Sequence, residues 1–278
     1  MNTNNAASSL PVIAFIGGGN MASAIIGGLI HQGQPASQIL VVEPFEPARV
    51  ALQAHYGITA QAEAGTQLAR ASIVVWAVKP QTFKDAAALT RAHTGEALHV
   101  SVAAGIRSDS IAKWLGTERI VRTMPNTPAL VGKGMSALFA RPAVSAAERA
   151  QVEAIMATTG DFLWVETEKQ LDAVTALSGS GPAYVFYFLE AMARAGTAMG
   201  LSQAQAHQLA VGTFVGASEL ARRSDDAPAV LRERVTSKGG TTYAALQSME
   251  KDAVGAHFEA AMRAAEQRAQ ELGDEFGV

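Results

Sequence analysis

Short apolar segments alternate with segments of helical pattern along the first half of the chain. This alternation restricts the possible folds more than any other feature of the sequence. Continuous apolar strands separated by helices are typical of a parallel sheet that is covered on both faces. The expected strands are residues 12–16, 39–42, 73–77, 98–102, 120–124, 135–139 and 162–165. The expected helices are residues 21–30, 47–55, 82–91, 110–115 and 146–158. We therefore predict an α/β domain with a doubly wound parallel sheet at residues 11–168, preceded by a flexible tail at residues 1–10.

The second half of the chain is expected to be helical throughout. After about residue 168 no segment has a convincing strand pattern, and long alanine-rich patterns follow. Turn-forming sequences separate them: SGSGP at 178–182, MGLS at 199–202, SDDAP at 224–228 and SKGG at 237–240. The expected helices are residues 171–177, 183–199, 203–221, 227–234, 243–249 and 256–271. We predict an all-α domain at residues 169–278 that packs alone or with a second copy of the chain.

The composition excludes several classes of protein. A net charge of −3 argues against a nucleic-acid surface, which needs basic patches to neutralise phosphates. The absence of cysteine excludes disulfides and thiolate metal sites, and the histidines lack metal-ligand spacing, so no metal is expected. The N-terminal MNTNNAASSL does not resemble a signal peptide, and Glu190 and Arg194 interrupt the most apolar stretch. We expect a cytoplasmic protein without a membrane span.

A glycine motif directly follows the first expected strand. The segment Gly17-Gly18-Gly19-Asn20-Met21-Ala22 fits G-x-G-x-x-G/A with alanine in the third place. In such motifs the glycines allow a tight turn and close approach of a pyrophosphate, which the N–H groups of the following helix face. A glycine-rich turn without a ligand is the alternative. The position between a strand and a helix favours a dinucleotide site.

An acidic residue ends the second expected strand. Glu43 stands where a carboxylate usually binds the adenine ribose hydroxyls and disfavours a 2′-phosphate, so it favours NADH. Arg49 is an alternative partner for a 2′-phosphate, which would favour NADPH. A helix-capping or surface role for Glu43 is the other interpretation.

Further candidates follow the later strands, because ligands lie at the carboxyl edge of such sheets. Lys79 is placed to reach a phosphate, ribose or carboxylate, or else is a solvated loop lysine. The small residues of Ala103-Ala104-Gly105 would let a nicotinamide or ribose lie against the backbone. Asn126, within Met124-Pro125-Asn126-Thr127-Pro128, either lines the cofactor site or shapes a turn.

A second glycine-rich segment, Thr236-Ser237-Lys238-Gly239-Gly240-Thr241-Thr242, precedes an expected helix. Its glycines and hydroxyl residues can present several N–H groups to one anion, and a carboxylate fits such a nest. A well-capped helix is the alternative, because threonine is also a favoured cap.

Several segments resemble successive landmarks of the pyrroline-5-carboxylate reductase family. They are FIGGGNMASAI, VVWAVKPQ, RTMPNTPALVGKGMSAL, LDAVTALSGSGPAYVFYFLEAM and VTSKGGTTYAAL, and they span residues 15–246 in the family's order. The most specific are MPNTP, LSGSGPAY and S-x-G-G-T-T. The resemblance implies an oxidoreductase that reduces 1-pyrroline-5-carboxylate to L-proline, the last step of proline biosynthesis, with NADPH or NADH.

The resemblance also implies an architecture. It predicts an N-terminal Rossmann-type domain and a C-terminal dimerisation domain whose helices interlock in a homodimer. Such dimers commonly assemble further, often to decamers. The site is expected between the Rossmann-type domain of one subunit and helices of the dimer.

The same resemblance assigns roles to individual residues. The pyrophosphate is assigned to Ile16, Gly17, Gly18, Gly19, Asn20 and Met21. The nicotinamide half is assigned to Ala77, Val78, Lys79, Pro80, Ala103, Ala104 and Gly105. The substrate carboxylate is assigned to Ser237, Gly239, Gly240 and Thr241, the ring nitrogen to Thr242, and an acidic approach to the substrate to Glu168. Thr242 and Lys79 are the candidate catalytic residues.

Two residues depart from the family's pattern. Glu43 is unfavourable for the 2′-phosphate of NADPH, which the family often uses, so the choice of cofactor stays open. Lys238 stands where SPGGTT-like versions have proline, which should matter little if backbone groups bind the substrate.

The expected chemistry needs few catalytic groups. A protonated cyclic imine accepts hydride readily, so the protein mainly has to orient the reactants and anchor a carboxylate. We expect the hydroxyl of Thr242 to orient the ring nitrogen and not to drive protonation, because a hydroxyl is a weak acid.

Two other functions remain as alternatives. A related hydroxyacid dehydrogenase would place a catalytic lysine on an interdomain helix, yet no lysine lies between Lys169 and Lys238. A nucleotide sensor without catalysis would keep the glycine motif but would not need the S-K-G-G-T-T segment.

Overall fold

The computed structural model describes residues 10–277, so the predicted tail at residues 1–10 lies outside the described residues except for Leu10. The chain forms two compact units. One comprises residues up to Ser180 together with those from Ala265 onward, and the other is Gly181–Ala264. The first unit extends beyond residue 168 because helix α6 (Gln170–Val174) packs against its sheet. The domain limits 11–168 and 169–278 stay predictions.

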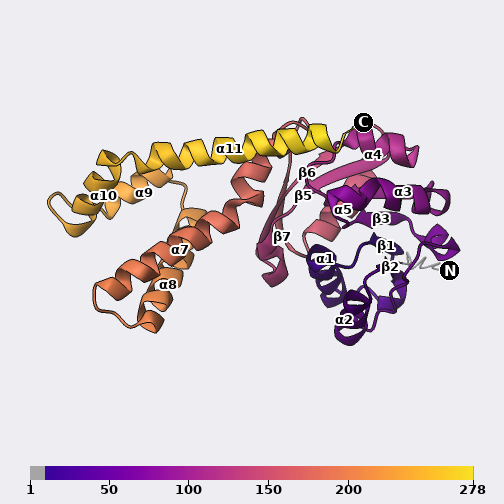
Figure 1. The fold of residues 1–278 in the computed structure, drawn as a ribbon, viewed down its shortest axis with the longest axis horizontal. Helices are drawn as coiled ribbons and strands as arrows, with labels where there is room; N and C mark the ends of the chain where they lie inside the picture. Colours follow the sequence, from indigo (N-terminus) through magenta and orange to yellow (C-terminus); the bar gives the residue numbers. More distant parts are fainter. Residues whose placement is uncertain (1–9, 278) are drawn as a thin grey trace, which may run out of the picture. The chain divides into compact units, whose positions relative to one another are not determined.

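The first unit is built on a seven-stranded sheet of order β2-β1-β3-β4-β5-β6-β7 (Figure 1). The strands are β1 (Ile13–Ile16), β2 (Ile39–Val42), β3 (Ile73–Trp76), β4 (Leu98–Ser101), β5 (Ile120–Met124), β6 (Gly134–Ala140) and β7 (Gly160–Trp164). Strands β1 to β5 are parallel, as expected, and the Rossmann-type fold class is confirmed.

The sheet departs from the predicted parallel arrangement at its far edge. Strand β6 is antiparallel to β5, and β7 is parallel to β6. Only the short helix η3 (Thr127–Val131) lies between β5 and β6. That connection is too short for the crossover that a parallel pair requires, so the chain reverses direction.

Helices cover both faces of this sheet, because alternate side chains of each buried strand point to opposite faces. The helices are α1 (Asn20–His31), α2 (Glu46–Tyr56), α3 (Pro80–Thr94), α4 (Ser108–Leu115) and α5 (Ala146–Met156). In β1, Ile13 and Phe15 join the core formed with α1 and α5, whereas Ala14 and Ile16 join the core formed with α3 and α4. The two cores fix the strand ends that carry the candidate site.

A histidine is buried in the sheet beneath α3. His99 is 1% exposed, its Nδ1 accepts a hydrogen bond from Trp76 Nε1 at 3.0 Å, and its Nε2 lies 3.1 Å from the carbonyl oxygen of Thr94. This geometry fixes the neutral tautomer with the proton on Nε2. Burial lowers the pKa of His99 from 6.5 to about 4, against the opposing effect of the hydrogen bond to Thr94.

As the pH decreases, we expect the free energy of unfolding to fall because of His99, and to do so at pH values where the histidine of the folded protein is still neutral. Its pKa falls from 6.5 to about 4 on folding, so the unfolded chain binds the proton first as the pH decreases. Stability is therefore fully present above pH 6.5 and lost by about 3 kcal/mol between pH 6.5 and pH 4. Urea unfolding at several pH values measures this, with His99→Asn as a control that does not titrate. Equal pH dependence in both proteins would contradict the assignment.

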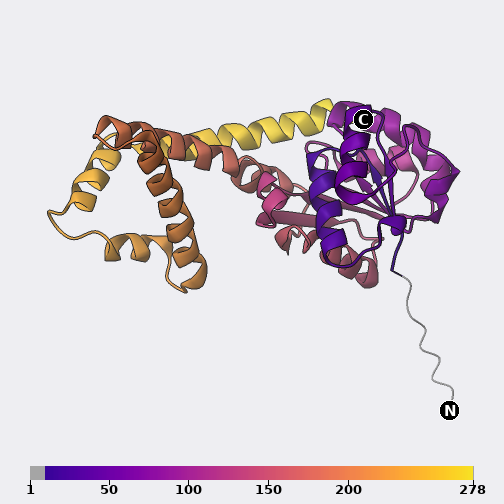
Figure 2. The ribbon, with the colours of Figure 1, turned by 90° about the horizontal axis from the view of Figure 1, so that it is seen from below.

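The second unit contains helices only, as predicted for this part of the chain. They are α7 (Gly181–Ala198), α8 (Gln203–Arg223), α9 (Pro228–Arg234), α10 (Thr241–Lys251) and the beginning of α11 (Val254–Glu275) (Figure 2). The α7–α8 turn contains Gly200 at φ +100°, and α8 begins with a capping box in which Ser202 and Gln205 exchange hydrogen bonds. Both features set the sharp reversal between these two packed helices.

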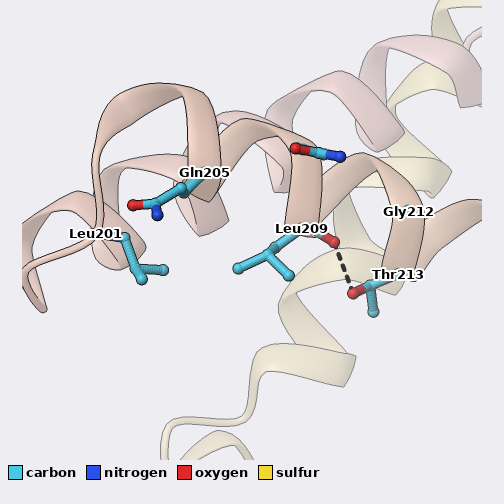
Figure 3. Close-up of a pocket in the computed structure, with 6 residues that line it drawn as sticks. Leu201, Gln205, Leu209, Gly212 and Thr213 are labelled. Atoms are coloured by element: carbon cyan, nitrogen blue, oxygen red, sulfur yellow. Dashed lines mark hydrogen bonds between the residues drawn. The ribbon is translucent and has the colours of Figure 1, made fainter.

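Large apolar side chains of the second unit face outward. Phe186 and Tyr187 on α7 are 64% and 66% exposed, and Leu209 on α8 is 58% exposed. Figure 3 shows Leu201 and Leu209 among the residues that line an open pocket along α8 and the turn before it. Exposed apolar patches of this kind mark protein–protein contact surfaces.

No helix among residues 10–277 combines the length and apolar character needed to cross a membrane.

Candidate functional site

The turn after β1 requires glycine at its first position. Gly17 has φ +96°, and its N–H donates to the carbonyl oxygen of Val42 at 2.8 Å. A Cβ atom at Gly17 would lie 2.5 Å from the carbonyl oxygen of Ala77. The left-handed conformation and this close approach both exclude a side chain. The turn therefore packs closely between the ends of β2 and β3, at the carboxyl edge of the sheet.

The second glycine of the motif contacts the acidic residue at the end of β2. The N–H of Gly18 donates to Glu43 Oε2 at 2.7 Å, and the N–H of Phe45 donates to Glu43 Oε1 at 2.7 Å. The carboxylate is thus held beside the glycine turn. Helix α2 has Phe45 and not Glu43 as its N-cap residue. The position suits a carboxylate that binds the ribose of a dinucleotide.

Arg49 lies at the same corner as Glu43. Its Nη1 donates to the carbonyl oxygens of Glu43 and Pro44 at 3.0 and 2.6 Å. The structure therefore brings together both groups that the sequence proposes for contact with the ribose. The arginine is anchored to the loop backbone, whereas the carboxylate is anchored to the glycine turn.

The start of α1 is open to an anion. Gly19 is its exposed N-cap residue, no side chain caps it, and no atom lies within 4 Å of the place a Cβ would take. No acidic residue occupies the first turn, which begins with Asn20. Ile16 and Met21 are instead turned towards the cores beneath. The helix dipole and its first N–H groups can therefore receive a pyrophosphate.

The segment after β3 lies next to the glycine turn. The N–H of Ala77 donates to the carbonyl oxygen of Ile16 at 2.8 Å, which joins the two strand ends. Val78 is half-buried against the core below. Lys79 is exposed and is the N-cap residue of α3, and Pro80 begins the helix. Its fixed φ suits that first helical position.

The turn after β4 packs closely against the end of the chain. Ala103 is buried, its N–H donates to Ser101 Oγ at 3.3 Å, and Ala104 follows it in the turn. Gly105 has φ +72°, and a Cβ there would lie 2.9 Å from Cβ of Leu272 in α11. Packing against α11 therefore explains the glycine at 105. The access for nicotinamide at this turn stays a prediction from the sequence.

Asn126 shapes its loop through all parts of its side-chain amide. Its Nδ2 donates to the carbonyl oxygen and to Oγ of Ser178, each at 3.2 Å. Its Oδ1 accepts from the N–H of Met135 at 2.9 Å. The loop after β5 is thus tied to β6 and to the SGSGP segment, which agrees with the turn-shaping interpretation. A cofactor contact by Asn126 stays a prediction.

Glu168 is fully engaged inside the first unit. Its carboxylate accepts hydrogen bonds from the N–H and Oγ of Ser108 and from Nη1 of Arg122. Nearby, Asp172 is half-buried, and burial raises the pKa of its carboxyl. Sequence reasoning missed Arg122 and Ser108. The available signal was an arginine in a buried, mostly apolar strand, which needs an acidic partner.

The start of α10 carries the second predicted site, in the second unit. Gly239 has φ +75°, and the N–H of Gly240 donates to the carbonyl oxygen of Ser237 at 2.9 Å. Gly240 is the N-cap residue, without a side-chain cap, so Thr241 and Thr242 are the first helical residues. Threonine therefore does not cap this helix, and its first turn also lacks acidic residues. This arrangement suits a bound carboxylate.

Comparisons with known proteins agree with this geometry. Residues 168–272 match the family described as pyrroline-5-carboxylate reductase dimerisation, and residues 12–105 match that described as NADP oxidoreductase coenzyme F420-dependent. Pyrroline-5-carboxylate reductase of Pseudomonas aeruginosa is 45% identical over 97% of this chain and 99% of its own length. That of Pisum sativum is 37% identical over 94% of this chain and 95% of its own.

Solved structures show the same relationship over the whole fold. A pyrroline-5-carboxylate reductase from Coxiella burnetii matches with a TM-score of 0.87 and 36% identity, covering 94% of this chain and 98% of that one. Pyrroline carboxylate reductase of Plasmodium falciparum with NADP bound matches with a TM-score of 0.85 and 28% identity, covering 95% and 98%. The glycine turn, the open start of α10 and these matches together show that the chain belongs to the pyrroline-5-carboxylate reductase family.

Proposed function

We propose that the protein reduces 1-pyrroline-5-carboxylate to L-proline with NAD(P)H. The observation that carries this proposal is the open start of α10, where Gly239 and Gly240 precede two helical threonines without a capping side chain. A nucleotide sensor would have no use for this second anion site. The 45% identity to a relative named pyrroline-5-carboxylate reductase, over 97% of the chain, supports the same substrate.

The nucleotide corner of the first unit fits NAD(P)H. Gly17 and Gly18 allow the tight turn, because a Cβ at either would meet protein atoms, and the uncapped start of α1 at Gly19 faces open space and offers N–H groups to a pyrophosphate. We propose that residues 16–21, 77–80 and 103–105 bind this cofactor, together with Glu43 and Asn126. When bound, NAD(P)H supplies the hydride that reduces the imine carbon.

We propose that NADH is the preferred form of the cofactor. The carboxylate of Glu43 is held at the glycine turn by the N–H of Gly18 at 2.7 Å. There it can accept hydrogen bonds from ribose hydroxyls, but it repels a 2′-phosphate. Arg49, bonded to backbone carbonyls of the same loop, would only partly offset this repulsion.

On the substrate side, we propose that the start of α10 anchors the carboxylate. The donors in this proposal are the hydroxyls of Ser237 and Thr241 and the N–H of Gly239, whereas Gly240 holds the turn by donating its own N–H to the carbonyl oxygen of Ser237. A carboxylate gains from both the donors and the positive end of the helix dipole. We propose that Lys79, exposed at the start of α3, contributes a positive charge to the nicotinamide half.

Thr242 is the residue that we propose for contact with the ring nitrogen. Replacing it with alanine is expected to lower kcat about tenfold, because one orienting hydrogen bond is lost, while the Kd of NADH stays unchanged. Steady-state rates and a fluorescence titration of NADH measure the two effects. Thr236→Ala is a matched control for the structural effect of removing a threonine hydroxyl nearby, since the hydroxyl of Thr236 bonds the carbonyl oxygen of Arg232 within the fold. A full rate in Thr242→Ala would refute the role.

Assembly and location are further parts of the proposal. The match to a dimerisation family over residues 168–272 shows that this family's members associate as homo-oligomers. We propose a homodimer formed through the C-terminal helices, whose exposed apolar faces would be covered in it, and further assembly to a decamer. A cytoplasmic location stays a prediction from the sequence.

The function is tested by following the consumption of NADH and NADPH, in parallel, with pyrroline-5-carboxylate near neutral pH. We expect oxidation of both, faster with NADH, and proline as the product. Folded protein that binds NADH but oxidises neither cofactor would refute the reductase and favour the nucleotide sensor.

A further inference from the structure

The turn between β4 and α4, residues 102–107, is held at its α4 end by the carboxylate of Glu168. Oε1 of Glu168 accepts from the N–H of Ser108 at 2.6 Å, and Oε2 accepts from Oγ of Ser108 at 2.5 Å. Ser108 is the first residue of α4, so the carboxylate closes the positive end of that helix. The position of Ser108 also limits the position of the turn, because the last residue of the turn is joined to Ser108 by a peptide bond.

An ion pair prevents Glu168 from leaving this position. Nη1 of Arg122 lies 2.6 Å from Oε1 of Glu168, and the side chain of Arg122 is only 8% exposed. If the carboxylate turned towards a ligand, it would leave a buried guanidinium without its partner, which is strongly unfavourable. Ser108 is also held from a second direction, since Arg141 Nη1 donates to its Oγ at 3.1 Å. This environment suits a structural anchor and does not suit a mobile substrate ligand.

The opposite side of the turn has weaker support. Gly105 packs on Leu272, and Arg107 Nη2 lies 2.5 Å from Oδ1 of Asp274. The side chains of that second pair are 46% and 71% exposed, so solvent screening leaves it little energy. Ala103 and Ile106 bury the middle of the turn in the core, and the buried contacts of Glu168 fix its end at Ser108.

We propose that Glu168 is a positioning residue for the nicotinamide half of the cofactor and not a ligand of the substrate. It acts through Ser108, which holds the turn containing Ala103 and Gly105 at the carboxyl edge of the sheet. The inference rests on the proposed function in one respect, namely that this turn lines the nicotinamide.

Two ligands separate this role from a general effect on the fold. NADH carries the nicotinamide, whereas ADP-ribose has the same adenosine and pyrophosphate without it. In Glu168→Gln we expect the Kd of NADH to rise about tenfold, because charged hydrogen bonds are lost, and that of ADP-ribose to change by less than about twofold. The KM of pyrroline-5-carboxylate at saturating NADH should stay unchanged. Glu166→Gln, which alters an exposed carboxylate close by in sequence, should behave like the wild type.

A milder variant guards against loss of folding. Ser108→Ala removes only the hydroxyl contacts, so we expect the same selective loss of NADH affinity, by about threefold. Equal loss of NADH and ADP-ribose affinity in both variants would overturn the proposal. So would unchanged affinity for NADH with a raised KM for the imine. If the wild type oxidises no NADH with pyrroline-5-carboxylate but the selective loss persists, the proposed function fails and the positioning role stands.

Discussion

Replacing Gly17 with alanine is expected to weaken the binding of NADH and NADPH at least about 100-fold and to destabilise the fold by about 3 kcal/mol. A residue with a side chain is strained at φ +96°, and its Cβ would lie 2.5 Å from the carbonyl oxygen of Ala77. That oxygen belongs to backbone next to β3 and cannot rotate away. The turn itself would have to move, and with it the N–H groups that we propose for the pyrophosphate.

Fluorescence titration and thermal unfolding measure the two effects of Gly17→Ala. Gly95→Ala is a suitable control, because Gly95 has φ −58° and no atom lies within 4 Å of an added Cβ. That variant should retain wild-type stability and nucleotide affinity. If Gly17→Ala also bound NADH normally, the close packing of the turn on β3 would not control the nucleotide site.

Replacing Glu43 with serine is expected to shift the ratio of kcat/KM for NADPH to that for NADH about 100-fold towards NADPH. The substitution removes the charge that repels a 2′-phosphate and the acceptor for ribose hydroxyls. It also breaks the hydrogen bond from Gly18, so NADH should bind less tightly in absolute terms. Arg49 would remain at the corner to receive the phosphate.

Parallel steady-state rates with the two cofactors test this prediction. Glu46→Gln is the matched control, since Glu46 is an exposed acidic residue in the first turn of α2. It changes the net charge equally without touching the carboxylate that Gly18 holds. An unchanged ratio in Glu43→Ser would show that another group selects the cofactor.

Much of the first unit is predictable because its strands are short, buried and apolar. Their periodicity identifies β2 and β5 to the residue, yet it carries no information on direction, so the reversal at β6 is missed. The short connection through η3 is the feature that decides it. Glycine positions in the site are also predictable, because few residues other than glycine accept such turns.

The contacts of polar side chains are much harder to predict. Arg122 and Glu168 meet although they are distant in sequence, and only the fold shows that Glu168 also binds Ser108. His99 is one of several histidines of which the sequence shows only that they lack metal-ligand spacing. Its lowered pKa arises from burial among residues of β3 and α3 that no local pattern reveals.

In the proposed homodimer, the outward-facing apolar side chains of α7 and α8 would make the free energy of unfolding depend on protein concentration. Small residues such as Ala206, Ala210 and Gly196 make up the buried part of these two helices, whereas Phe186, Tyr187 and Leu209 are exposed. A homo-oligomer that covers these side chains gains stability by mass action, and for a dimer each tenfold dilution removes about 1.4 kcal/mol. Expression level and assay dilution thus become determinants of how much folded enzyme a sample contains.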